Sequence, residues 1–247
     1  DVVCGEGTEL VDGYCVKKTT DVVDDTNNPD DTENPDDTEN PDDTETPVYV
    51  DACQTDLSVY GSEASSFEMV WSDEFEYEGK LDDTKWEYLI GNGGSYGIPG
   101  WGNNELQYYT DQNTSFNDGI MSITARYESY GSREYTSSRI VTNYKASWTY
   151  GIFEARIKLP SGLGTWPAFW MMPSTSRYGG WPDSGEIDIM EHVGYDENII
   201  HGTIHTEAFN HKINTQIGAS YSEFDDVTEE FHVYKIEWLP DRIMWYV

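Results

Sequence analysis

Short runs of alternating apolar and polar residues, separated by Gly, Asn, Asp and Pro, constrain the fold more than any other feature of this chain. In the run 151–159 (GIFEARIKL), charged residues occupy every second position from Glu154 onward, which is the period of a strand with one wet face. Comparable runs lie at 67–71, 119–125, 186–190, 199–205, 231–238 and 242–247. Many short strands with turn residues between them predict an all-β sandwich.

Composition divides the chain near residue 50. Residues 1–50 carry 16 acidic and 2 basic residues, whereas the remainder carries 31 and 12 and holds all nine Trp. The two parts therefore have net charges of −14 and −19 within a total of −33. Between Asp24 and Pro47 the sequence repeats every six residues as DDTNNP, DDTENP, DDTENP and DDTETP. Like charges and regular prolines without apolar residues predict an extended, solvated linker.

The predicted organisation is a small Cys-containing segment over 1–23, the acidic linker over 24–50, a connecting segment over 51–66 and a folded domain over 67–247. Calcium binding by the Asp-rich repeats is a weaker alternative, because the glycines that shape calcium-binding turns are missing.

Cys4 and Cys15 bracket a short Gly-containing turn, which is compatible with a small disulfide loop in an exported protein. Two free thiols remain an alternative, and Cys53 is left over in either case. No run approaches the roughly 18 apolar residues that a membrane-spanning helix needs. The final run, 242–247, has the character of a strand with no turn or partner after it. We therefore expect the chain to end within a domain whose further strands follow.

The acidic balance disfavours nucleic acid and anionic membrane surfaces as partners, because both would be repelled. A neutral partner such as an uncharged sugar polymer stays open.

The segment 184–194 (SGEIDIMEHVG) concentrates three carboxylates. Glu186 and Asp188 share one face of a regular strand, whereas Glu191 has the wrong parity and would point into the core. A one-residue β-bulge around Ile189 and Met190 brings all three to one side. Such a cluster is expected to retain one proton near neutral pH, which suits a general acid. Paired carboxylates favour glycoside hydrolysis, although a solvated strand of acids is the plain alternative.

Two neighbouring segments favour the catalytic interpretation. The run 165–173 (TWPAFWMMP) supplies aromatic rings that can stack on pyranose rings, and 100–109 (GWGNNELQYY) mixes aromatic and amide side chains that suit sugar hydroxyls. Each segment alone is as compatible with a structural role.

The string GEIDIMEHVG resembles the signature of glycoside hydrolase family 16, in particular its laminarinase branch of endo-β-1,3-glucanases. The resemblance continues in order through WGNNELQYYT, YGIFEARIKLPSGLGTWPAFWMMP, HGTIHT and FHVYKIEW, and covers roughly residues 67–247. It implies a concanavalin A-like jelly roll of two curved antiparallel sheets, the concave one forming an open cleft, and a retaining mechanism.

By motif position, Glu186 resembles the nucleophile, Glu191 the acid/base, and Asp188 the residue that hydrogen-bonds the nucleophile. A retaining pair implies carboxyl groups about 5 to 5.5 Å apart. The resemblance further implies a histidine close to the acid/base, His205, although a satisfied strand histidine is an alternative. The other implied sugar-binding residues are Trp101, Asn103, Glu105, Arg139, Trp166 and Trp170. No cofactor is required; some family members bind a structural calcium, so calcium is possible.

The sequence thus predicts a secreted or cell-surface, monomeric endo-β-1,3-glucanase acting on laminarin-like or mixed-linkage glucans. The alternatives are another specificity of the same family, such as agarase, carrageenase, lichenase or transglycosylase, and a non-catalytic glucan-binding sandwich. Few bases after residue 50 disfavour sulfated substrates, and the intact acid cluster disfavours the binding protein.

Overall fold

The computed structural model of the chain describes Thr8–Val11, Tyr14–Lys17 and residues 67–247. The chain divides into two units, residues 1–50 and 51–247. In the first unit, β1 (Thr8–Val11) and β2 (Tyr14–Lys17) pair as an antiparallel hairpin. The predicted acidic linker and the proposed disulfide pairing lie outside the described residues. The predicted domain boundaries stay predictions.

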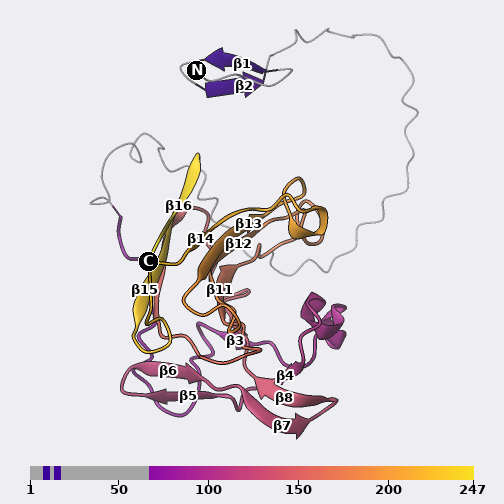
Figure 1. Ribbon diagram of the computed structural model, residues 1–247, viewed down its shortest axis with the longest axis vertical. Coiled ribbons are helices and arrows are strands. Elements are labelled where there is room, and N and C mark those ends of the chain that lie inside the picture. The colour runs from indigo at the N-terminus through magenta and orange to yellow at the C-terminus, as the bar shows by residue number, and fades with distance from the viewer. Residues whose placement is uncertain (1–7, 12–13, 18–66) are drawn as a thin grey trace, which may run out of the picture. The chain divides into compact units, whose positions relative to one another are not determined.

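The second unit is built from strands, as the alternating runs predict. One sheet has the order β10-β15-β16 and another has the order β11-β12-β13-β14, with antiparallel pairing throughout both (Figure 1). Their bounds are β10 Gly151–Ile157, β11 Ala168–Met171, β12 Glu186–Glu191, β13 Ile200–His205, β14 Ile217–Tyr221, β15 His232–Leu239 and β16 Arg242–Tyr246.

Smaller sheets precede these strands in the sequence. They pair β3 with β9, β5 with β6, and β8 with both β4 and β7. Their bounds are β3 Glu87–Tyr88, β4 Gln107–Tyr109, β5 Thr114–Asn117, β6 Ile120–Ile123, β7 Arg126–Tyr130, β8 Arg133–Ser137 and β9 Ile140–Val141. Within residues 67–247, helical structure is limited to the 3-10 turns η4 Gly94–Tyr96, η5 Pro99–Gly102 and η6 His211–Ile213.

Three details differ from the sequence-based expectation. The run 67–71 forms no strand, and its Met69 and Val70 side chains are largely exposed. The pair β4 and β8 is parallel rather than antiparallel. Parallel neighbours need a long connection, and β5, β6 and β7 lie between these two strands along the chain. The run 242–247 contains β16, which does have a partner, since it pairs with β15 across a tight turn.

The core lies between the two larger sheets. Its buried members include Met190 of β12, Ile200 of β13 and Tyr234 of β15, packed with Leu159 and Val227. Figure 1 shows the β15–β16 ribbon facing the sheet that contains β12 and β13. Because one face of β12 is used by this core, the opposite face is available for polar side chains. The all-β sandwich prediction is confirmed.

Trp245 joins the two layers directly beneath the acid-bearing strand. Its indole Nε1 donates a hydrogen bond of 3.0 Å to the backbone oxygen of Asp188. A Cβ at Gly202, on the neighbouring β13, would lie 2.5 Å from that same Nε1. Glycine at 202 therefore allows the indole to approach β12.

Replacing Gly202 with alanine should lower the free energy of unfolding by about 2 kcal/mol, because the anchored indole cannot move without losing its hydrogen bond. Urea unfolding of the purified chain measures this change. Gly180→Ala is the matched control, since a Cβ at Gly180 meets nothing within 4 Å. Equal unfolding midpoints for the two variants would contradict the packing described here.

Candidate active site

A β-bulge in β12 brings three carboxylates to one face of the sheet. Asp188 pairs with Thr203 and Glu191 with His201, so three steps along β12 correspond to two along β13. The register with β11 shifts at the same place, between the partners of Asp188 and Met190. The extra residue is Ile189, which is buried. The bulge predicted from side-chain parity is therefore confirmed.

Asp188 is the most enclosed of the three acids, with 3% of its surface exposed. Burial, followed by the charges of Glu186 and Glu191, raises the pKa of Asp188 to about 9. The protonated Asp188 carboxyl is hydrogen-bonded to Glu186, and this contact favours the ionised form of Glu186. Asp188 therefore holds the retained proton of the cluster and uses it to donate a hydrogen bond to Glu186.

His205 lies on the other side of Asp188, with its Nε2 3.4 Å from Asp188 Oδ2. Burial lowers the pKa of His205, with a smaller contribution from the nearby His211. Since burial raises the pKa of Asp188, both groups are neutral near pH 7 and their contact is not an ion pair.

Glu186 begins β12 and accepts a hydrogen bond from the indole Nε1 of Trp181. Burial raises the pKa of Glu186, and the Glu191 charge adds to this effect. The hydrogen bonds from Trp181 and Asp188 act in the opposite direction, as does the positive charge of Arg139. Glu186 is thus a desolvated carboxylate whose charge is held by two donors and a cation, a combination that suits a nucleophile.

Glu191 ends β12 in a different environment. The indole Nε1 of Trp166 donates to Glu191 Oε1 at 2.8 Å. Burial raises the pKa of Glu191, while this hydrogen bond and the nearby His201 and His211 lower it. A carboxyl with a raised pKa can carry a proton and release it, which is the requirement for an acid/base.

Arg139 connects this acid cluster to the loop around residue 100. Its guanidinium lies between two indole rings, 4.6 Å from the centroid of Trp101 and 4.7 Å from that of Trp170. Burial lowers the pKa of Arg139, and the charges of nearby acids, including Glu105 and Glu186, oppose that shift. The stacked arginine therefore places a fixed positive charge beside the acids.

Glu105 is held by several donors around the same loop. Its carboxylate accepts hydrogen bonds from Gln107 and from the Tyr109 hydroxyl at 2.7 Å, and Asn103 Nδ2 lies 3.4 Å from its second oxygen. Trp101, in contrast, is only 5% exposed and donates to the Gly91 carbonyl. A ring covered by Arg139 supports the loop, and in this structure it offers no open face for a sugar to stack on.

The structure therefore gathers most of the predicted site residues. The three acids, Arg139, Trp170 and Trp166 lie around β11 and β12, and the Trp166 ring is 53% exposed. His205 was expected close to Glu191, but it pairs across the strands with Glu186 and contacts Asp188. The histidine opposite Glu191 is His201.

Trp181, His201 and His211 were missed by the sequence reasoning. Trp181 donates to Glu186, and its ring packs against His205 and His211 at centroid distances of 5.6 and 4.8 Å. Its position only five residues before Glu186 was an available signal. His211 comes from the η6 turn, and spacing in the sequence gives no indication that this turn lies beside the acids.

Within the described parts of the chain, no group of three or more His, Cys, Asp or Glu side chains is arranged to hold a metal ion. The same residues include no helix with the length and apolar character needed to cross a membrane.

Comparison with known proteins identifies the family. The family model described as Glycosyl hydrolases family 16 matches residues 101–247. The chain belongs to glycosyl hydrolases family 16. The resemblance inferred from GEIDIMEHVG is thereby confirmed, and the β12 acids of this family 16 chain lie within the matched region.

Similar proteins include the "Beta-glucanase" of Rhodothermus marinus, 52% identical over 77% of this chain and 67% of that protein. The "Glucan endo-1,3-beta-glucosidase" of Cryptopygus antarcticus is 42% identical over 71% of this chain and 64% of its own length. The chain thus spans about two thirds of these curated relatives.

Among solved structures, the laminarinase from Rhodothermus marinus aligns with a TM-score of 0.68 and 53% identity, covering 73% of this chain and 71% of that one. The endo-beta-1,3-glucanase from Pyrococcus furiosus gives a TM-score of 0.66 and 45% identity, covering 72% and 70%. The likeness confirms that this family 16 chain has the predicted jelly-roll fold.

Proposed function

We propose that this chain is an endo-acting glycoside hydrolase that cleaves β-1,3 linkages in laminarin-like or mixed-linkage β-glucans with retention of configuration. The observation that carries the proposal is the bulged strand β12. It sets Glu186 and Glu191 on one face in different hydrogen-bonding environments, with the protonated Asp188 between them. Membership of family 16 and relatives named as β-1,3-glucanases support the same activity.

The reaction follows a double displacement. Glu186 attacks the anomeric carbon and forms an ester with it, while the glycosidic bond breaks and its oxygen takes the proton of Glu191. Glu191 then removes a proton from water, whose oxygen attacks the same carbon and releases Glu186 as a carboxylate. Asp188 keeps its proton throughout and donates a hydrogen bond that adapts to the changing charge of Glu186.

A neutral glucan is the substrate class that fits the charge of the domain. Residues 51–247 carry a net charge of −19, which would repel sulfated or uronic polymers. One relative, 32% identical, is named "Keratan-sulfate endo-1,4-beta-galactosidase", so a sulfated polymer is the substrate class to weigh against a neutral glucan. The scarcity of bases favours laminarin over such polymers for this chain.

Chromatography of the products from laminarin, mixed-linkage glucan, agarose, carrageenan and keratan sulfate tests the assignment. We expect a ladder of oligosaccharides from laminarin and none from the sulfated polymers. Cleavage of agarose but not laminarin would overturn the specificity. Laminarin binding without hydrolysis by the folded chain would instead favour a glucan-binding protein, the name given to a relative from Penaeus monodon.

Replacing Trp181 with phenylalanine should move the acid limb of the kcat/KM pH profile to higher pH. The indole donates to Glu186 and stabilises its ionised form, so its loss raises the pKa of Glu186. Glu186 must be ionised to attack, and activity then disappears earlier as the pH falls. A shift of about 0.5 to 1 pH unit is expected from loss of one such hydrogen bond. The profile of Trp148→Phe, whose indole packs against Trp71 away from the acids, is the control.

We also propose that the protein acts outside the cell, where its polymeric substrate is found, as a monomer that needs no cofactor. Cell fractionation and size-exclusion chromatography test the first two points. Unchanged activity after treatment with a calcium chelator supports the third point. A lower thermal unfolding midpoint in the chelator would indicate a structural calcium.

A further inference from the structure

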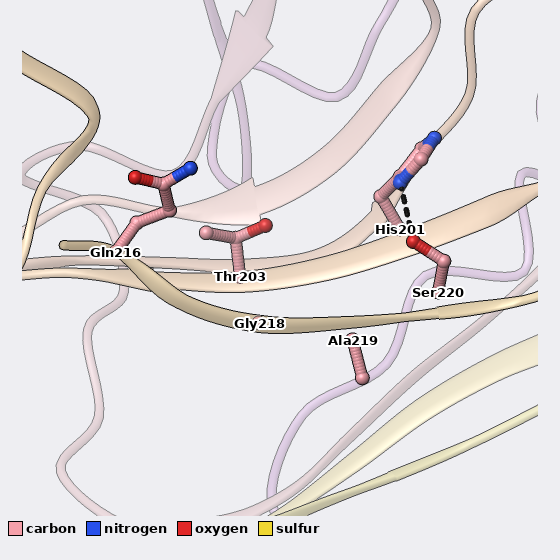
Figure 2. Close-up of a pocket in the computed structure, with 6 residues that line it drawn as sticks. All are labelled: His201, Thr203, Gln216, Gly218, Ala219 and Ser220. Carbon is pink, nitrogen blue, oxygen red and sulfur yellow. Dashed lines mark hydrogen bonds between the residues drawn. The ribbon is translucent and has the colours of Figure 1, made fainter. Parts of the chain in front are cut away.

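The connection between β13 and β14 carries a turn that lies against Trp181, the donor to Glu186. Figure 2 shows the two strands side by side along one hollow, with Gln216 at the end where the connection enters β14. Within the connection, the η6 turn is the part that reaches Trp181. Contacts therefore extend from a loop outside the acid-bearing strand toward the candidate nucleophile.

Asn210 fixes the conformation of this turn at its first position, where its side chain is buried. Its Nδ2 donates to the backbone oxygens of Thr206 and Glu207 at 3.1 Å each, and its Oδ1 accepts from the backbone nitrogen of Lys212 at 3.1 Å. Such a cap satisfies backbone groups that the end of a turn leaves free. The backbone at Lys212 is therefore anchored, although the residue is exposed.

Two successive residues of η6 pack against the Trp181 ring. The His211 ring lies 4.8 Å from it, centroid to centroid, and Lys212 Nζ lies 4.7 Å from the same indole centroid. Among aromatic side chains, Trp offers the strongest cation–π attraction, so the ammonium group favours one placement of the ring. The indole is therefore held by an imidazole and a cation that come from a single turn.

The orientation of this ring decides where its donor points. An indole N–H lies in the plane of the ring, and that of Trp181 donates to Glu186. Burial raises the pKa of Glu186, and this hydrogen bond opposes the rise. A ring that turned out of place would leave the carboxylate less stabilised. Contacts that hold Trp181 therefore act on Glu186 through the indole.

Other titratable or charged groups lie near Glu186 or pack against its indole donor. They include Asp188 and Glu191 on β12, Arg139 before β9, His205 on β13 and His211 on η6. A change confined to Lys212 leaves this set in place.

We propose that Lys212 is a positioning residue for the nucleophile: its ammonium group, anchored by η6, orients the Trp181 indole so that Nε1 donates to Glu186. The inference rests on the proposed function, in which Glu186 attacks the anomeric carbon. It adds to that function a residue that acts through another side chain.

The acid limb of the kcat/KM pH profile for laminarin measures this role. Glu186 must be ionised to attack, so a weaker hydrogen bond raises its pKa and moves the limb to higher pH. Lys212→Met, which removes the charge from a side chain of similar length, should raise the limb by about 0.3 pH unit. On the acid side this shift is about a twofold loss of kcat/KM, with the plateau unchanged. Lys212→Arg, which restores a cation, should return the limb to its wild-type position.

A double variant with Trp181→Phe tests whether Lys212 acts through the indole. In the Trp181→Phe background, Lys212→Met should produce no further shift, because the donor is already gone. Lys235→Met is the matched control: Lys235 Nζ lies 4.2 Å from the Tyr246 ring centroid in the sheet opposite the acids, and loss of that contact should leave the limb in place. An unchanged limb in Lys212→Met, an equal shift in Lys212→Arg, or additive shifts in the double variant would overturn the proposal.

NMR of the Trp181 indole N–H gives a measurement that needs no turnover. The resonance is assigned by its absence from Trp181→Phe, and its pH titration follows the ionisation of Glu186. We expect the titration midpoint to rise by about 0.3 pH unit in Lys212→Met and to stay in place in Lys235→Met. Equal midpoints in the wild type and Lys212→Met would overturn the proposal, whether or not laminarin is cleaved. A wild-type chain that does not hydrolyse laminarin would refute the proposed function alone.

Discussion

Replacing Glu186 with glutamine should lower kcat for laminarin hydrolysis by about 10⁴-fold or more, because removal of a covalent nucleophile leaves only binding and electrostatic effects. The amide is nearly isosteric and can still lie beside Trp181 and Asp188, so binding of laminarin should persist. A reducing-end assay measures the loss, and isothermal calorimetry measures the binding.

Glu154→Gln is the matched control for this variant. Glu154 is an exposed glutamate on β10, in the sheet opposite the acids, and its replacement removes the same charge from the domain. We expect unchanged turnover for that control. If Glu186→Gln retained more than about one hundredth of wild-type turnover, a nucleophilic role for this residue would be untenable.

Replacing Glu191 with glutamine should lower kcat for laminarin by about 10² to 10⁴-fold and remove the alkaline limb of the pH profile. Burial raises the pKa of Glu191, so in the wild type the acid form persists to higher pH than for an exposed glutamate. Activity is then lost as the pH rises through that pKa. A glutamine cannot titrate, and the limb should therefore disappear.

A nitrophenyl glycoside gives this second prediction a sharper form. Its good leaving group needs little protonation. Formation of the glycosyl enzyme should therefore be slowed far less by Glu191→Gln with this substrate than with laminarin. Azide, which needs no general base, should restore turnover of the Glu191→Gln variant by giving a β-glycosyl azide. Equal losses on laminarin and on the nitrophenyl substrate, without rescue, would assign Glu191 another role.

The strands and the bulge could be predicted because they depend on local alternation. The alternation of polar and apolar residues in GIFEARIKL predicts a strand, and β10 forms there. The position of Glu191 on the wrong face of a regular strand required one extra residue, which Ile189 supplies. The run 67–71 was also expected to be a strand but forms none, because strand formation depends on the surrounding sheet as well as on local alternation. Pairing is a property of the whole sheet.

Side-chain environments in the site were harder to predict. The sequence indicates that a crowded acid cluster retains a proton, but the burial that assigns it to Asp188 comes from the packing of neighbouring strands. Trp101 was expected to bind sugar, whereas its ring packs under Arg139. Trp181 reaches Glu186 across a loop, and such contacts leave no periodic signal in a sequence.

The most direct test of the double-displacement account is covalent trapping. A 2-deoxy-2-fluoro glycoside of a β-1,3-glucan oligosaccharide slows release of the glycosyl enzyme, and mass spectrometry of peptides then locates the attached sugar. We predict one label per chain, on Glu186 in the peptide that contains β12. A label on another residue, or an unlabelled enzyme whose first product from laminarin is the α-anomer, would contradict the proposed mechanism.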